Sequence, residues 1–123
     1  RSLVGSEMCI RDRANGTPIA APDASGTIAM AAGAGKVIVA NTTAVVGCNG
    51  SSTPCTAAQL AQIVDLVGYG AANFFEGAGP APVISGTIAD FRAENGCTDT
   101  DNNNLDFAAS VPSPRSTTLR MRQ

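Results

Sequence analysis

The amino-acid sequence predicts an all-β fold of the sandwich or barrel type. Turn-forming residues recur about every ten positions, as at Asn49-Gly50, Gly77–Pro82 and Asn95-Gly96. Short runs of β-branched and apolar residues lie between these turns, and strands at this spacing are typical of sandwiches and barrels. With 123 residues, the chain has the length of one domain.

The expected elements follow in chain order. The expected strands are Thr27–Met30, Lys36–Asn41, Gln62–Tyr69, Thr87–Arg92 and a short piece at Leu105–Phe107. Apolar residues at successive positions of Lys36–Ala40 predict a central strand with both faces covered. Thr56 and Gln59 have the spacing of a capping box, which predicts a single helical turn before the chain extends at Ile63.

The first residues of the chain do not resemble a protein domain. Residues 3–13, LVGSEMCIRDR, match one reading frame of a transposase-type DNA sequencing adapter. We therefore expect residues 1–13 to be an artefactual segment and the native domain to occupy residues 14–115. Residues 116–123 are polar and basic without a strand pattern, so they are expected to form a disordered or artefactual tail.

The charge balance argues against nucleic-acid binding by the body of the domain. Between residues 14 and 119, three basic residues stand against eight acidic ones, a net charge of −5. Gripping a phosphate backbone requires clustered Lys and Arg, which this stretch lacks. No membrane span is expected either, because the longest apolar stretch, Ile28–Ala40, is interrupted by Gly33, Gly35 and Lys36.

Cys48 and Cys55 flank a segment of turn formers and are expected to form a disulfide. The alternative is a pair of reduced thiols in a cytosolic loop. Since persistent disulfides are typical of oxidising compartments, the bridge predicts an extracellular or cell-surface location. Cys97 is left over, and its partner is expected to lie beyond the ends of the native stretch. A zinc site is excluded by the absence of His and by the cysteine spacing.

The segment beginning at Asp99 allows two interpretations. Asp99, Asp101 and Asn103 place oxygen-bearing side chains at positions one, three and five, as a calcium loop does. An EF-hand would then need Gly and Glu where the chain has Asn104 and Ser110. The interpretation we favour is a set of Asx turns, in which these side chains bond nearby backbone N–H groups.

No catalytic constellation can be assembled from the sequence. His is absent, so the commonest general base is missing. The carboxylates of Asp99, Asp101 and Asp106 form a cluster in an Asn-rich turn, where hydration leaves their pKa values unsuited to catalysis. The glycines before Lys36 do not fit a phosphate loop. We therefore expect neither an enzyme nor a cofactor.

Four ordered motifs resemble bacterial lamin tail domains from about Gly16 to Arg115. They are the segment NGTPIAAPDASGTIAMAAGAGKVIVAN, the strand IVDLVGYG, the stretch NFFEGAGPAP with SGTIADFR, and GCTDTDNNNLDF with PSPR. The resemblance implies an immunoglobulin-like β-sandwich. The opening segment of the family has no counterpart here, so the sandwich is expected to be incomplete, with its early strands missing. Unpaired strand edges would then favour poor solubility or self-association.

The resemblance also assigns roles to individual residues. Residues of the shared motifs are expected to be structural. Gly68 and Gly70 would allow close backbone approach, and Asp99, Asp101 and Asp106 would organise the last turns. Asp65 is expected to satisfy a neighbouring turn rather than serve a ligand.

Three hypotheses for function follow. The first is a non-catalytic interaction or adhesion module of a secreted or cell-surface bacterial protein, whose partner is a protein or cell-surface ligand and which is joined to other domains of its parent protein. The second is an accessory domain of an extracellular nuclease or phosphatase, which Arg115, Arg120 and Arg122 favour and the charge of the body opposes. The third is a calcium-dependent structural module through Asp99, Asp101 and Asn103.

Overall fold

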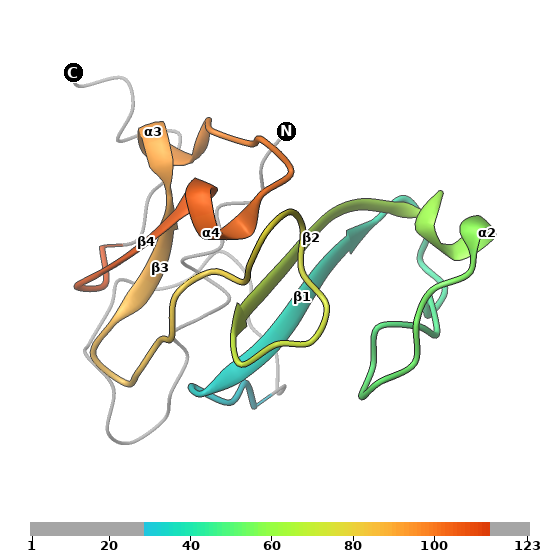
Figure 1. The fold of residues 1–123 in the computed structure, drawn as a ribbon, viewed down its shortest axis with the longest axis horizontal. Coiled ribbons are helices and arrows are strands. Elements are labelled where there is room, and N and C mark those ends of the chain that lie inside the picture. Colours follow the sequence, from blue (N-terminus) through green and yellow to red (C-terminus); the bar gives the residue numbers. More distant parts are fainter. Residues whose placement is uncertain (1–28, 114–123) are drawn as a thin grey trace.

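A computed structural model of the chain describes residues 29–113 (Figure 1). In chain order, its elements are β1 (Ala34–Ala40), α2 (Ala57–Leu60), β2 (Ile63–Gly70), β3 (Ala89–Arg92), α3 (Ala93–Gly96), α4 (Asn103–Asp106) and β4 (Phe107–Ser110). Strand β1 pairs with β2 and β3 pairs with β4, both antiparallel. The prediction of a β-rich fold is confirmed.

The expectations for the two ends of the chain lie outside the described residues. They concern the adapter-like residues 1–13, the start of the domain at residue 14, and the tail 116–123. The first expected strand, Thr27–Met30, lies partly outside as well. Its described residues, Ala29 and Met30, belong to no regular element.

Strands β1 and β2 form the longer pair and lie close to their expected ranges. Lys36 is paired with Gly68, and the register shifts between Val39 and Ala40. Every residue of β1 is only half-buried, so the expectation of a central strand with both faces covered is wrong. Within residues 29–113, β2 is the only strand paired with β1, and the apolar residues of β1 keep some contact with solvent.

The second edge of β2 is covered by the backbone around Ala81. The Ala81 N–H donates to the Gly68 carbonyl at 2.7 Å, and the Gly70 N–H donates to the Ala81 carbonyl at 2.9 Å. A Cβ at Gly68 would overlap the Phe74 carbonyl oxygen, and Gly70 has a φ of +61°. The expected role of both glycines in close backbone approach is confirmed.

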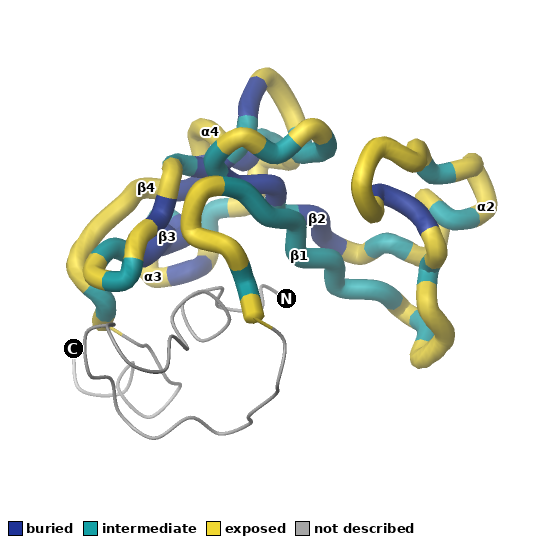
Figure 2. Tube along the Cα trace, turned by 90° about the horizontal axis from the view of Figure 1, so that it is seen from below, coloured by how far each residue is buried: buried dark blue, intermediate teal, exposed yellow. Residues whose placement is uncertain are grey.

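The hydrophobic core joins the two sheets. Tyr69 of β2 and Phe107 of β4 are buried together with Ala81 and Ile84. The Tyr69 hydroxyl donates a hydrogen bond to the Ala31 carbonyl at 2.6 Å, which satisfies its polar end. Figure 2 shows the buried segments mainly around β2, β3 and β4, whereas the end of the molecule that carries α2 is largely exposed.

The helices of the described part are single turns of four residues each. Helix α2 begins with the predicted capping box between Thr56 and Gln59, and β2 follows at Ile63. Helix α3 contains Glu94 and Asn95 with φ angles of 50° and 59°, so it is a turn with a left-handed kink. Among residues 29–113, no helix is long and apolar enough to cross a membrane.

The strand expected at Leu105–Phe107 is displaced along the chain. Helix α4 occupies this region up to Asp106, and strand β4 begins at Phe107. The N–H groups of Thr100 and Asn102 donate to Asp106 Oδ2 at 2.9 and 3.3 Å. These hydrogen bonds hold the chain in a turn, which postpones the extended conformation until Phe107.

Candidate functional site

Arg92, the last residue of β3, is the centre of a buried charge cluster. Only 2 % of its surface is exposed. Its guanidinium lies 2.7 Å from Asp65 Oδ2, 2.8 Å from Asp99 Oδ1 and 3.9 Å from Asp106 Oδ2. It also stacks over the ring of Phe107, at 4.6 Å from the ring centre. A buried guanidinium requires such neighbours, because an unpaired charge in the interior is strongly destabilising.

The carboxylates of this cluster come from separate parts of the chain. Asp65 belongs to β2, Asp106 ends α4, and Asp99 lies in the turn between α3 and α4. Asp65 therefore connects β2 to β3 through Arg92, a longer-range role than the neighbouring turn expected for it. The expectation did not include this ion pair because the two residues lie 27 positions apart.

Asp106 organises the last turn, as the sequence predicted. Its carboxylate accepts hydrogen bonds from the Thr100 N–H at 2.9 Å, the Thr100 hydroxyl at 2.7 Å and the Asn102 N–H at 3.3 Å. Burial alone would raise the pKa of Asp106, but these hydrogen bonds and the nearby Arg92 charge hold it below its usual value. The carboxylate is therefore a structural anion.

Asn103 joins α4 to β2 through a fully buried amide. Its Oδ1 accepts the N–H groups of Gly68 at 2.8 Å and Glu76 at 3.2 Å. Its Nδ2 donates to the Leu66 carbonyl at 3.0 Å and to Glu76 Oε2 at 3.3 Å. The side-chain amide oxygen of Asn103 is therefore used in hydrogen bonds inside the protein.

The residues of the expected calcium loop have separate roles in the structure. Asp99 pairs with Arg92 and accepts the Asp101 N–H at 3.4 Å, which is the Asx-turn bonding we favoured. Asp101 is exposed and has a φ of 53°. Asn103 turns inward, because β2 supplies the backbone partners for its amide.

A different group of carboxylates comes together beside Arg92. Asp65, Glu76 and Asp99 each place an oxygen within 4.8 Å of the others, the one such group of possible metal ligands among residues 29–113. Burial raises the pKa of Asp65, and Arg92 offsets this only in part. Burial also raises the pKa of Glu76, to which the charges of Asp65 and Asp99 add. The group is therefore rich in negative charge.

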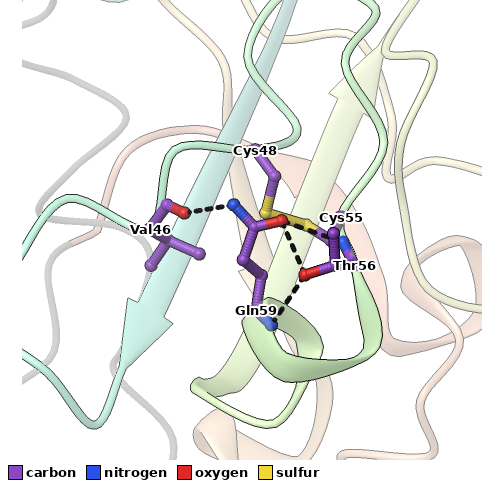
Figure 3. Close-up of a disulfide and its surroundings, with 5 residues drawn as sticks. All are labelled: Val46, Cys48, Cys55, Thr56 and Gln59. Atoms are coloured by element: carbon purple, nitrogen blue, oxygen red, sulfur yellow. Dashed lines mark hydrogen bonds between the residues drawn. A yellow bond between two sulfur atoms is a disulfide. The ribbon is translucent and has the colours of Figure 1, made fainter.

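The predicted disulfide between Cys48 and Cys55 is confirmed (Figure 3). The two Cα atoms lie 4.9 Å apart, and Cys48 is buried. Cys97, the remaining cysteine of the described part, is exposed. The bridge closes the part of the chain that directly precedes α2.

This disulfide loop, residues 41–62, is also braced by side chains. Gln59 donates from Nε2 to the Val46 carbonyl at 2.7 Å, while its Oε1 accepts the Thr56 N–H at 2.9 Å (Figure 3). Lys36 of β1 donates to the Ser51 carbonyl at 2.9 Å and so ties the loop to the sheet. Because these contacts hold the loop at both ends and across its middle, the loop loses little conformational entropy when its surface binds a partner.

Two large apolar side chains of the disulfide loop face solvent. Val45 is 94 % exposed and Leu60 is 55 % exposed. Both belong to the disulfide loop, the segment that projects beyond the sheets on the side of α2 in Figure 1. Neither side chain adds to the core, so their apolar character has no structural explanation within residues 29–113.

Arg92 and Glu76 are the important residues that sequence reasoning missed. The signal available was a basic residue at the end of an expected strand, in a stretch (residues 14–119) where eight acidic residues stand against three basic ones. Their partners depend on how separate strands pack, and no local pattern reports this. Comparison with known protein families, curated proteins and solved structures found no match to this chain.

Proposed function

We propose that the chain is a non-catalytic, immunoglobulin-like interaction module of a secreted or cell-surface bacterial protein, related to lamin tail domains. The observation that carries this proposal is the disulfide loop, which is braced internally and presents Val45 and Leu60 to solvent. Binding residues are often found on loops that a rigid scaffold positions. Exposed apolar side chains on such a loop are suited to contact a partner.

The disulfide supports the extracellular part of the proposal. Cytosolic thiols are kept reduced in most organisms, so a bridge that braces a loop is most useful outside the cytoplasm. Cys48 is a buried residue of this loop, and its bridge to Cys55 stabilises the conformation that presents Val45 and Leu60. The partner is accordingly a protein or a polymer of the cell surface.

The accessory-nuclease alternative has little support from the described residues. Lys36 and Arg92 are the basic residues between positions 29 and 113. Lys36 donates to Ser51 and Asn73, and Arg92 is buried among carboxylates. Neither side chain is available to hold phosphate groups in the way that nucleic-acid binding requires.

The test is binding of the purified, oxidised chain to immobilised cell-surface polymers and surface proteins. We expect retention on at least one of them. The double substitution Val45→Asp with Leu60→Asp should weaken that binding by about tenfold or more, because a charge at an apolar contact must be desolvated. Val111→Asp is the matched control, since Val111 is 64 % exposed and follows β4, away from α2. Retention on none of the surfaces, or equal loss in the control, would refute the proposal.

A further inference from the structure

The carboxylates around Arg92 carry more negative charge than one guanidinium can balance. Asp65, Glu76 and Asp99 form the close group, and Asp106 lies beside the same guanidinium. Four carboxylates against one arginine leave an excess of three negative charges. Such an excess in a partly buried place favours a bound cation.

One oxygen of this group has no partner. The Asp65 side chain is only 10 % exposed, and its Oδ2 is bonded to Arg92. Its Oδ1 is buried and accepts no hydrogen bond. Buried acceptors are satisfied in nearly all proteins, so an unpartnered oxygen on a buried carboxylate that approaches two other carboxylates points to a bound cation.

We propose that Asp65, Glu76 and Asp99 bind a calcium ion, with Asp65 as the most deeply buried of the three ligands. Calcium–oxygen distances of about 2.3–2.6 Å allow two ligands on opposite sides of the ion to lie about 5 Å apart. The three oxygens, all within 4.8 Å of one another, satisfy that limit. Water molecules complete the coordination from the side of Asp99, whose side chain is 42 % exposed.

This ligand set differs from a linear loop that begins at Asp99. Asn103 Oδ1 is bonded to two backbone N–H groups, and the Asp106 carboxylate is saturated by Thr100 and Asn102. Those oxygens are not available to an ion. Burial raises the pKa of both Asp65 and Glu76, and a calcium ion between them would lower both.

The test is calcium titration of the full 123-residue chain by calorimetry, together with thermal unfolding in calcium chloride and in chelator at equal ionic strength. We expect a saturable heat of binding and a midpoint of unfolding that rises with calcium concentration. Asp99→Asn should weaken calcium binding by about tenfold or more, because it removes a charged ligand. Asp101→Asn is the matched control, since it removes the same charge from the same exposed turn outside the group.

A second variant, Glu76→Gln, keeps the size of the side chain and should also weaken calcium binding. The proposal is overturned if the wild-type chain shows no heat of binding and unfolds at the same temperature in calcium and in chelator. It is also overturned if Asp101→Asn weakens binding as much as Asp99→Asn. In that case the ion is held by the exposed turn alone.

Discussion

Arg92 connects segments that lie far apart in the sequence. Its guanidinium bonds Asp65 of β2 and Asp99 of the turn after α3, while its own strand β3 pairs with β4. The stack on Phe107 places the same side chain against the core. Because Arg92 pairs with carboxylates from separate parts of the chain, its replacement should destabilise both sheets.

We predict that Arg92→Met lowers the free energy of unfolding by about 3–5 kcal/mol, because it leaves the buried Asp65 and Asp106 without their cation. Lys36→Met is the control, since Lys36 makes its hydrogen bonds at an exposed position, and it should cost about 1 kcal/mol or less. Urea unfolding followed by circular dichroism measures both. Losses of equal size would contradict the role assigned to Arg92.

Asp90 of β3 is also a buried carboxylate, and it has no ion-pair partner within residues 29–113. It is 2 % exposed, and neither of its oxygens has a hydrogen-bond partner. Burial raises its pKa from 3.8 to about 6. The folded state therefore binds this proton more tightly than the unfolded state, and stability falls as the pH rises between about 4 and 6.

The effect expected of Asp90→Asn follows from this fall in stability with rising pH. Raising the pKa of Asp90 from 3.8 to about 6 corresponds to about 3 kcal/mol. The wild-type protein loses this free energy when Asp90 ionises at pH 7, whereas the variant has no carboxyl group to ionise. The variant should therefore gain stability relative to wild type as the pH is raised from 4 to 7. Asp101→Asn, which removes a carboxylate from an exposed position, is the control. Denaturant unfolding at several pH values measures the difference in stability between wild type and Asp90→Asn. A difference that stays the same at every pH would contradict the role assigned to Asp90.

The disulfide loop is the element whose conformation depends most on local chemistry. The Cys48–Cys55 bridge, the capping box at Thr56 and the hydrogen bond from Gln59 to Val46 all lie within it. Each of these contacts spans few residues. The loop is therefore stabilised largely independently of how the two sheets pack.

We predict that replacing Cys48 and Cys55 together by Ser lowers the free energy of unfolding by about 2.5 kcal/mol, through the greater entropy of the opened loop in the unfolded state. Cys97→Ser should change stability much less, because the Cys97 side chain is exposed and lies outside the loop that the bridge closes. Guanidinium unfolding under non-reducing conditions compares the two. An equal effect would show that the bridge does not stabilise the loop.

The distance along the chain between interacting residues explains which features the sequence could predict. Strands β1 and β2, the turn of α2 and the disulfide follow from local patterns, and they lie close to their expected positions. The strand expected at Leu105–Phe107 was wrong because the Asp106 carboxylate accepts hydrogen bonds from the Thr100 and Asn102 N–H groups, which favours a turn there. Arg92 and Glu76 were missed because their partners come from other strands, which no local pattern identifies.

At the scale of the whole molecule, charge distinguishes the candidate functions. Seven acidic residues stand against Lys36 and Arg92 in the described part. Both basic side chains are used in contacts within the chain. The described surface therefore repels a polyanion.

We predict that the chain does not retard double-stranded DNA in a gel-shift assay, even at low salt, where electrostatic binding is strongest. The measurement includes a basic DNA-binding domain as a positive control. A shift that appears at low salt and weakens as salt is added would favour the accessory-nuclease alternative over the interaction module.

The measurement that tests the central claim most directly is amide hydrogen exchange of the chain, free and bound to the surface ligand that retains it. The proposed function predicts slower exchange on binding in the disulfide loop, residues 41–62, around Val45 and Leu60. Exchange in β4 and at Val111 should stay unchanged. Protection confined to β3 and β4, with no change in the disulfide loop, would contradict the proposal that this loop is the binding surface.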